Sequence, residues 1–274
     1  VEISWPLIAL MSATAFLLKA LLHCLEIYQS IGPDLIAPNG MPLGSDFISL
    51  WSAGWLALAG NAPGAYDPET IRMAHGVAVP AITSLTLYHY PPSSLLLLLP
   101  FSGIGYVPGL FLFVGVTLAG FTCFLWRLRP HWTTLVLLAG YPALWINILG
   151  GQNGFLSGLL ICLALYGSTP FWQGLGWGLL TYKPHLGIPV PLALLISRSF
   201  KTIGWAVLVS LVFALAALLA FGIETYKAFL ADTDLTWLVL FKGLIPLDRM
   251  PSALSAVLGA NGIIPAAIAA QLMT

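Results

Sequence analysis

The most constraining feature of the sequence is a succession of long apolar segments with very few charges between them. Only 7% of the 274 residues are charged and 59% are hydrophobic, whereas a soluble domain carries roughly 25% charged residues. A surface so poor in charge has to contact lipid, and an apolar run of about 20 residues can cross a bilayer as a helix. The sequence therefore predicts an all-α, polytopic transmembrane helical bundle. The short alternating segments of a transmembrane barrel are absent.

The charge balance and the cysteines exclude other classes of protein. The net charge is zero, which argues against a nucleic-acid partner. Cys24, Cys123 and Cys162 lie inside apolar runs and form no CxxC pair, so we expect neither a disulfide framework nor a zinc site.

The two ends of the chain bear on its domain organisation. The run 5–28 is long enough to span a membrane, and no small-residue cleavage site follows it, so no cleavable signal is expected. The chain ends directly after the apolar run 253–273. We expect residues 1–274 to form a single transmembrane domain that is incomplete, because helices of a longer protein would follow its C-terminal end.

Residues 29–90 form the longest segment that does not span, directly after the expected first span at 5–26. Apolar residues at three- and four-residue spacing predict a short helix at 47–59 within it. Proline favours a first helical turn, which predicts a second helix at 68–75. We expect both helices to be interfacial, with Trp51 and Trp55 at headgroup depth.

Further apolar segments follow, and several are shorter than the ~20 residues that a straight crossing needs. Either 91–126 is one broken passage or it forms two short helices, and the same alternatives hold for 172–197. Broken helices at membrane depth are tolerated only where they line protein or a wet cavity, so these interruptions indicate a site. The expected segments are 91–101, 106–126, 133–149, 153–167, 172–181, 185–197, 203–222 and 251–272.

Arginine and lysine predict the orientation. Two short connections carry such pairs, Arg127 with Arg129 and Arg198 with Lys201, and the positive-inside rule places both in the cytoplasm. If 91–126 crosses once and 172–197 goes out and back, every polar cluster shares the outer face. Two crossings by 91–126 would instead put the first pair outside. The outer clusters are 29–90, 150–154, 181–185 and the loop 223–250.

Asp46 is the acid directly ahead of the expected helix at 47–59. One interpretation is an N-cap that accepts a backbone N–H. The other is a general base that takes a proton from an attacking sugar hydroxyl. The two remain compatible, because capping uses only one carboxylate oxygen.

Polar residues inside or beside apolar runs are the other candidates. Lys19, His23 and Glu26 share one face of the first span, where they either snorkel to the interface or serve a function. In "YHYPP", residues 88–92, the prolines start a helix, and His89 and Tyr90 are candidates for hydrogen bonds to a sugar or phosphate.

Two later turns carry further candidates. "GGQNG", residues 150–154, is interpreted as a turn with Asn153 capping the next helix, although Gln152 and Asn153 could also bind hydroxyls. "TYKPH", residues 181–185, places Lys183 and His185 between apolar segments. A lysine there has to reach water or an anion such as a lipid phosphate.

Taken in order, "DF…W…A", "Y.YPP", "GQ.N" and a late "KP" resemble the polyprenyl-phosphate-sugar-dependent membrane glycosyltransferases of the GT-C superfamily. Among these, the chain is most similar to glycosyltransferase family 87, which includes mannosyltransferases. The resemblance runs from the first span to about residue 225. It implies a GT-C bundle whose first extracytoplasmic loop, 29–90, holds the catalytic aspartate, which maps onto Asp46.

The resemblance also implies substrates and roles. The donor would be a polyprenyl-phosphate hexose, with mannose favoured, and the acceptor a glycolipid or glycan hydroxyl outside the plasma membrane. Transfer would invert the anomeric centre without metal or cofactor. Expected phosphate-binding residues are Lys183, His185, His89 and Arg72, and expected sugar- or acceptor-binding residues are Tyr90, Gln152, Asn153, His23 and Trp51.

A polytopic transporter or lipid flippase is the main alternative, because it too would have broken helices and intramembrane charges. The polar residues gather on one face rather than around a midplane site, and no inverted repeat is visible, which argues against it. An intramembrane protease is less favoured. Ser157 lies in an apolar run, but no histidine is in register with it.

Overall fold

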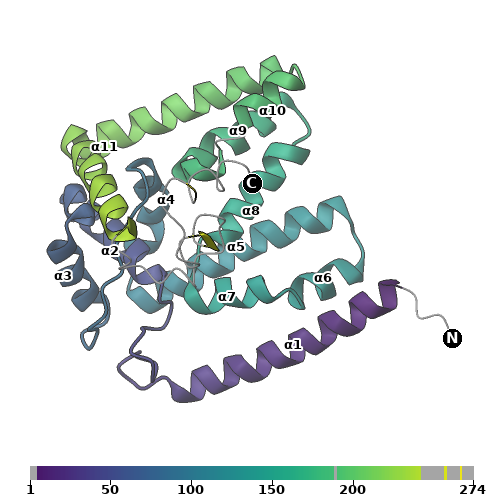
Figure 1. The fold of residues 1–274 in the computed structure, drawn as a ribbon, viewed down its shortest axis with the longest axis horizontal. Helices are drawn as coiled ribbons and strands as arrows, with labels where there is room; N and C mark the ends of the chain where they lie inside the picture. The colour runs from purple at the N-terminus through teal and green to yellow at the C-terminus, as the bar shows by residue number, and fades with distance from the viewer. Residues whose placement is uncertain (1–4, 188–189, 242–255, 258–265, 267–274) are drawn as a thin grey trace. The chain divides into compact units, whose positions relative to one another are not determined.

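The computed structural model describes residues 5–187, 190–241, 256–257 and 266 (Figure 1). This described part is all-α, with eleven α-helices, three 3₁₀ turns and one isolated bridge between Ile36 and Pro42. The chain divides into two compact units, 1–228 and 229–274. The site lies within the first unit.

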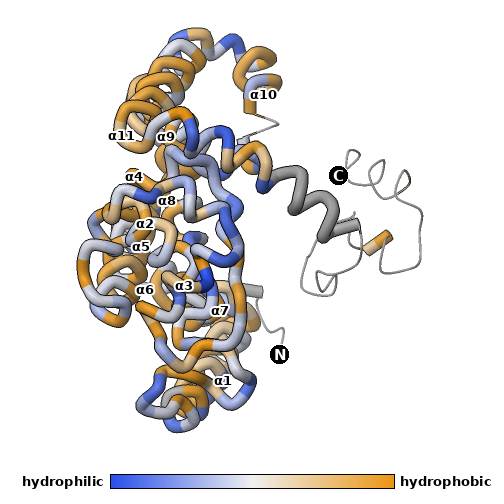
Figure 2. Tube along the Cα trace, turned by 90° about the vertical axis from the view of Figure 1, so that its left-hand side faces the viewer, coloured by the Kyte–Doolittle hydropathy of each residue, from blue (hydrophilic) through white to orange (hydrophobic). Residues whose placement is uncertain are grey.

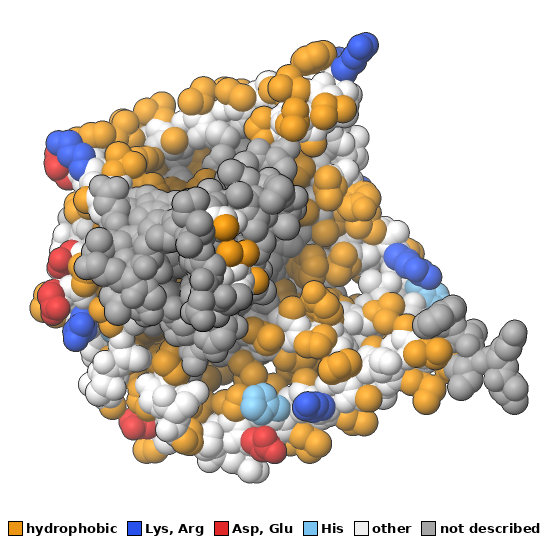
Figure 3. All heavy atoms as spheres, in the orientation of Figure 1, with side chains coloured by type: hydrophobic (Ala, Val, Ile, Leu, Met, Phe, Trp, Pro, Cys, Tyr) orange, Lys and Arg blue, Asp and Glu red, His pale blue; other side chains and the backbone are white. Residues whose placement is uncertain are grey.

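Among the described residues, three helices are long and apolar enough to cross a membrane: α1 (Trp5–Ser30), α5 (Tyr106–Leu128) and α11 (Phe200–Phe241). Figure 2 colours much of the described part of α11 orange, which marks hydrophobic residues. On the face shown in Figure 3, charged side chains lie at the edges among many hydrophobic ones. The expected membrane helical bundle is confirmed.

Helix α11 extends beyond the expected end of its span at residue 222. Gly222 breaks the helical geometry with φ 76°, in the left-handed region that favours glycine, and the helix then resumes to Phe241. The prediction of a loop over 223–250 is therefore wrong for its first half, because a glycine kink bent the helix instead of ending it. Residues 242–250 and most of the expected segment 251–272 lie outside the described residues.

The expected segment 133–149 is two helices, α6 (Trp132–Ala139) and α7 (Pro142–Gly150), which meet at a 62° bend and together could form a fourth span. The break lies against α1. A Cβ on Gly140 would come within 2.5 Å of Ala13 Cα, so only glycine allows this approach. Pro142 then starts α7.

The first loop holds α2 (Phe47–Leu58), η1 (Ala62–Tyr66) and α3 (Pro68–Ala78), close to the expected bounds. The surface position expected for α2 is wrong. Trp51 is only 4% exposed, and its indole N–H donates to the Ile104 carbonyl at 3.0 Å. Nine of the twelve α2 residues are buried, because α3, α4 and α5 pack around the helix.

Residues 91–126 form two helices rather than one broken passage. Helix α4 (Ser93–Ser102) ends before α5 and folds back on it, with the rings of Phe101 and Phe113 5.2 Å apart. Ten residues span only about 15 Å, which is too short for a crossing. This region therefore supplies one candidate crossing, α5.

The next two helices form a hairpin. The turn before its first helix and the turn after its second helix therefore lie at the same end. Helix α8 (Gly154–Tyr166) packs between α5 and α9 (Pro170–Leu179) (Figure 1). The chain continues through η2 (Leu180–Tyr182), η3 (Pro184–Leu186) and α10 (Val190–Ile196), so 172–197 consists of short pieces. The core at this end contains Leu160, Leu180, Tyr182 and Phe213.

Candidate functional site

Asp46 lies where the first loop meets the turn between α7 and α8. Its backbone N–H donates to the Gly150 carbonyl at 2.9 Å, and Gln152 Nε2 donates to its carboxylate Oδ2 at 2.9 Å, across 106 residues of sequence. Tyr106 at the start of α5 holds the preceding loop by donating to the carbonyls of Leu43 and Gly44. Half-buried Asp46 is therefore held through its backbone N–H, its carboxylate and the loop before it.

The N-cap interpretation of Asp46 is wrong for its side chain. Asp46 occupies the N-cap position of α2, but its carboxylate makes no capping hydrogen bond. Gln152 supplies a donor that no local pattern around residue 46 could reveal.

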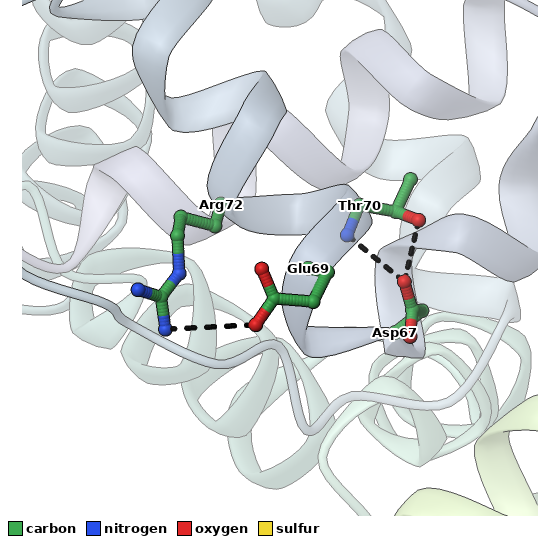
Figure 4. A network of polar contacts seen from close by, with 4 residues as sticks. All are labelled: Asp67, Glu69, Thr70 and Arg72. Atoms are coloured by element: carbon green, nitrogen blue, oxygen red, sulfur yellow. Dashed lines mark hydrogen bonds and ion pairs between the residues drawn. The ribbon is translucent and has the colours of Figure 1, made fainter.

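Asp67 shows what a capping aspartate looks like in the same loop. Its Oδ1 accepts from the Thr70 backbone N–H at 2.9 Å and from the Thr70 hydroxyl at 2.5 Å (Figure 4). These two bonds lower the pKa of the exposed Asp67 carboxyl. Asp67 therefore caps α3 with its side chain.

Lys183 lies between η2 and η3, beside the same α7–α8 turn. Its ammonium donates to Asn153 Oδ1 at 2.7 Å and lies 5.9 Å from the centre of the Tyr90 ring. Burial lowers the pKa of Lys183, and the negative charge of Asp46 opposes this shift. Lys183 and Asp46 thus bind adjacent residues of one turn, Asn153 and Gln152.

The side chain of Asn153 does not cap α8, which corrects the expected cap. It makes no capping bond, and Asn147 Oδ1 instead accepts from the Gly154 N–H at 2.9 Å. Asn153 is buried, and its Oδ1 accepts from the Lys183 ammonium at 2.7 Å. The tertiary contact with Lys183 replaces the local one.

Tyr182 is a site residue that the sequence reasoning did not select. Its hydroxyl lies 2.6 Å from Ser157 Oγ and donates to the Asn153 carbonyl at 3.3 Å, while its ring stacks on Tyr90 at 6.2 Å. Burial raises the pKa of Tyr182, so its phenol stays neutral. The sequence feature that could have indicated Tyr182 is its position next to Lys183 in "TYKPH".

The side chains of the remaining arginine and histidine candidates are exposed. Arg72 is exposed on α3, 4.0 Å from Glu69 (Figure 4), and His23 is exposed on α1, 3.5 Å from Glu26. His89 and His185 are also exposed. His89 directly precedes Tyr90, and His185 lies two residues after Lys183. The structure thus brings together Asp46, Tyr90, Gln152, Asn153 and Lys183.

The cluster offers chemistry without an evident metal site. A half-buried carboxylate can accept a proton, and a nearby ammonium can stabilise an anion. Among the described residues, no three His, Cys, Asp or Glu side chains lie close enough to bind a metal ion.

Comparison with known proteins identifies the family. Residues 88–274 match the model of glycosyltransferase family 87, a range that includes Tyr90, the α7–α8 turn and Lys183. Asp46 lies ahead of this range and is joined to it by the contacts with Gly150 and Gln152. Neither a curated protein nor a solved structure shows significant similarity to the chain. The match covers more than half of the chain, which therefore belongs to glycosyltransferase family 87 and is a membrane glycosyltransferase.

Proposed function

We propose that the protein transfers a hexose from a polyprenyl-phosphate donor to a hydroxyl of a glycolipid or glycan, with inversion and with Asp46 as general base. Mannose is the sugar that the family resemblance favours. The observation that carries the proposal is the meeting of Asp46 and Lys183 on adjacent residues of one turn, Gln152 and Asn153. A proton acceptor and an anion-binding cation are the two groups that this reaction needs.

The reaction proceeds as a single displacement. The acceptor oxygen attacks C1 of the sugar, its proton passes to Asp46, and the bond from C1 to the phosphate oxygen breaks. The bonding electrons move to the phosphate, where Lys183 stabilises the growing negative charge. The products are the inverted glycoside and the polyprenyl phosphate.

Lys183 suits a phosphate better than a structural role. Its contact with Asn153 is to a neutral amide oxygen, which leaves the ammonium charge uncancelled by that bond. A half-buried lysine is costly unless an anion or water stabilises it. A phosphate that arrives within the membrane supplies the anion.

An apolar cavity beside Lys183 supports a lipid-linked donor. Its volume is about 420 Å³, and the residues of α9, η3, α10 and α11 that line it all belong to the first unit. Pro184, the residue after Lys183, forms part of its wall, together with Trp177, Leu194, Val207 and Leu211. A prenyl chain in this cavity would bring its phosphate to the lysine.

The proposed site faces the extracytoplasmic side of the plasma membrane. Tyr106 at one end of α5 binds the loop before Asp46, and Arg127 lies in the last turn at the other end. The 23 residues of α5 correspond to about 34 Å, similar to the ~30 Å hydrocarbon core. If Arg127 is cytoplasmic, the site is outside.

Cysteine labelling tests this orientation. A cysteine at Ser30 or Asn61, in a variant without Cys24, Cys123 and Cys162, should react with an impermeant reagent in intact cells. Reaction only after the membrane is opened would reverse the proposed orientation.

A transfer assay tests the activity. The full-length protein, reconstituted in vesicles, should convert labelled polyprenyl-phosphate mannose and a glycolipid acceptor into glycosylated product, and this conversion should depend on Asp46. If no polyprenyl-phosphate hexose is a donor and a fluorescent lipid crosses the vesicle membrane instead, the flippase alternative replaces the proposal.

A further inference from the structure

Each of the four residues of the α7–α8 turn contacts a group that belongs to the site or adjoins it. Gly150 accepts the Asp46 backbone N–H, and Gln152 donates to the Asp46 carboxylate. Gly151 packs against Phe47, the first residue of α2. Asn153 accepts from Lys183. The turn therefore holds the candidate base with one residue and the candidate cation with the next.

The two glycines bring the turn into close contact with Asp46 and α2. A Cβ on Gly150 would lie 2.8 Å from Asp46 Oδ2, and one on Gly151 would lie 2.6 Å from Phe47 Cβ. Gly151 also has φ 62°, in the left-handed region. The short spacing makes the bond from Gln152 possible and limits the positions that the carboxylate can take.

Several hydrogen bonds hold Asn153 in place. Its side chain is buried, and its Oδ1 accepts from the Lys183 ammonium at 2.7 Å. Its carbonyl accepts from Tyr182, whose hydroxyl also lies 2.6 Å from Ser157. An amide with these partners has little room to rotate toward a sugar.

We infer that Gln152 and Asn153 are positioning residues that act through Asp46 and Lys183, rather than residues that bind the sugar. Gln152 occupies Oδ2 and orients the carboxylate, so that Oδ1 is the oxygen presented to the acceptor. Asn153 holds the ammonium where the phosphate leaves. This inference rests on the proposed function.

The turn also keeps the two charges apart. A carboxylate and an ammonium that share a partly buried site attract one another strongly, and direct contact would occupy the groups that the reaction needs. Neutral amides on consecutive residues give each charge a partner and prevent this contact. Both amides are uncharged, so neither neutralises the carboxylate or the ammonium.

Different kinetic parameters should respond to the two residues. Gln152→Ala should lower kcat by roughly tenfold to hundredfold, because a misplaced base reacts slowly, while the donor KM changes little. Asn153→Ala should raise the donor KM and weaken binding of decaprenyl phosphate by roughly tenfold. A merely structural role would lower the amount of folded protein without separating kcat from KM.

A crossed set of double variants gives the decisive test. In single-turnover assays, Gln152→Ala should have no further effect on Asp46→Asn, and Asn153→Ala should have no further effect on Lys183→Ala. Gln152→Ala should keep its full effect in Lys183→Ala, and Asn153→Ala should keep its full effect in Asp46→Asn. Additive effects in all four combinations, or a rise in acceptor KM alone, would overturn the inference in favour of direct sugar binding.

A charge variant and a matched control complete the test. Asn153→Asp keeps the acceptor oxygen but pairs Lys183 with a carboxylate, so decaprenyl phosphate should bind less tightly. Asn147→Asp makes the same change in the amide that caps α8 and should leave binding unchanged. Equal losses in both variants would contradict the assigned role of Asn153.

The outcome also separates this inference from the proposed function. If the wild-type protein transfers sugar but the crossed pattern is missing, only the inference fails. If the wild-type protein neither transfers sugar nor binds decaprenyl phosphate, both fail.

Discussion

Asp46 and Asp67 each stand directly before a helix of the first loop, and the structure uses them differently. Asp67 caps α3 through Thr70, three residues away, and is exposed. Asp46 makes no capping bond to α2 and binds Gln152 at a distance of 106 residues. The comparison teaches that one local pattern serves either helix stability or chemistry, according to what packs against it.

The largest expected effect comes from the same substitution at these two acids. Asp46→Asn keeps the shape but cannot accept the proton, so kcat should fall by ~10²–10⁴ in a folded protein that still binds donor. Asp67→Asn should retain near wild-type kcat. Radiolabelled product formation measures both, and more than about a tenth of wild-type turnover in Asp46→Asn would remove the base assignment.

The next effect compares two cations. Lys183→Ala should lower kcat/KM by roughly tenfold to hundredfold, because charge on the phosphate grows during transfer. Arg72→Ala, at an exposed residue paired with Glu69, should change kcat/KM by less than about twofold. Lys183→Arg need not rescue, since a planar guanidinium differs in shape from an ammonium. Equal kinetics for Lys183→Ala and wild type would exclude Lys183 from the site.

Two glycines sharpen the comparison without changing a polar group. Gly150→Ala places a Cβ 2.8 Å from Asp46 Oδ2, so the flexible carboxylate should shift and kcat should fall by roughly tenfold. Gly76→Ala on α3 meets nothing within 4 Å and should stabilise the helix by up to ~1 kcal/mol. Thermal unfolding in detergent and the transfer assay separate the two results. Unchanged kcat in Gly150→Ala would show that this contact does not orient the base.

The smallest effect concerns the pH range in which the loop is stable. Buried His75 lies 2.8 Å from Ser52 Oγ and 3.0 Å from the Thr86 carbonyl, and burial lowers its pKa, with a smaller contribution from Arg72. The unfolded chain therefore binds the proton more readily. The stability from neutral His75 is complete above the unfolded value of about 6.5 and is lost as the pH falls through the lower folded pKa.

Thermal unfolding between about pH 7.5 and about pH 5.5 measures this effect. The melting temperature should fall toward the acidic end, and His75→Gln should reduce that pH dependence. An equal slope in the variant would assign the effect to other groups. The turnover of the Asp46 and Asp67 variants should therefore be compared above about pH 6.5, where His75 is neutral in both the folded and the unfolded chain.

Local features of the fold were predictable because they depend on near neighbours. The helices at 47–58 and 68–78 and the Asp67 cap follow from spacing and from Pro68 within a few residues. The burial of Trp51 was not predictable in this way. It depends on α4 and α5, which cover α2 from later in the chain.

The contacts within the site, like the burial of Trp51, depend on residues far apart in the sequence. The sequence singled out Asp46, Gln152, Asn153 and Lys183 by residue type and setting, but it offered capping as the alternative for Asp46 and Asn153. A cap needs only the adjacent backbone, so a sequence pattern can suggest it. The bonds that replace it, to Gln152 and Lys183, join residues 106 and 30 positions apart.

The sequence by itself determined that this chain lies in a membrane, because seven charges in a hundred residues cannot cover a water-exposed surface. It also determined which polar residues interrupt the apolar runs. Only the tertiary structure decided which of them act together. The close approach of the two glycines in the α7–α8 turn to Asp46 and α2 brings the carboxylate to Gln152, and the hairpin of α8 and α9 returns Lys183 to Asn153. These are packing contacts between distant segments, and their energies depend on distances that a linear order of residues does not specify.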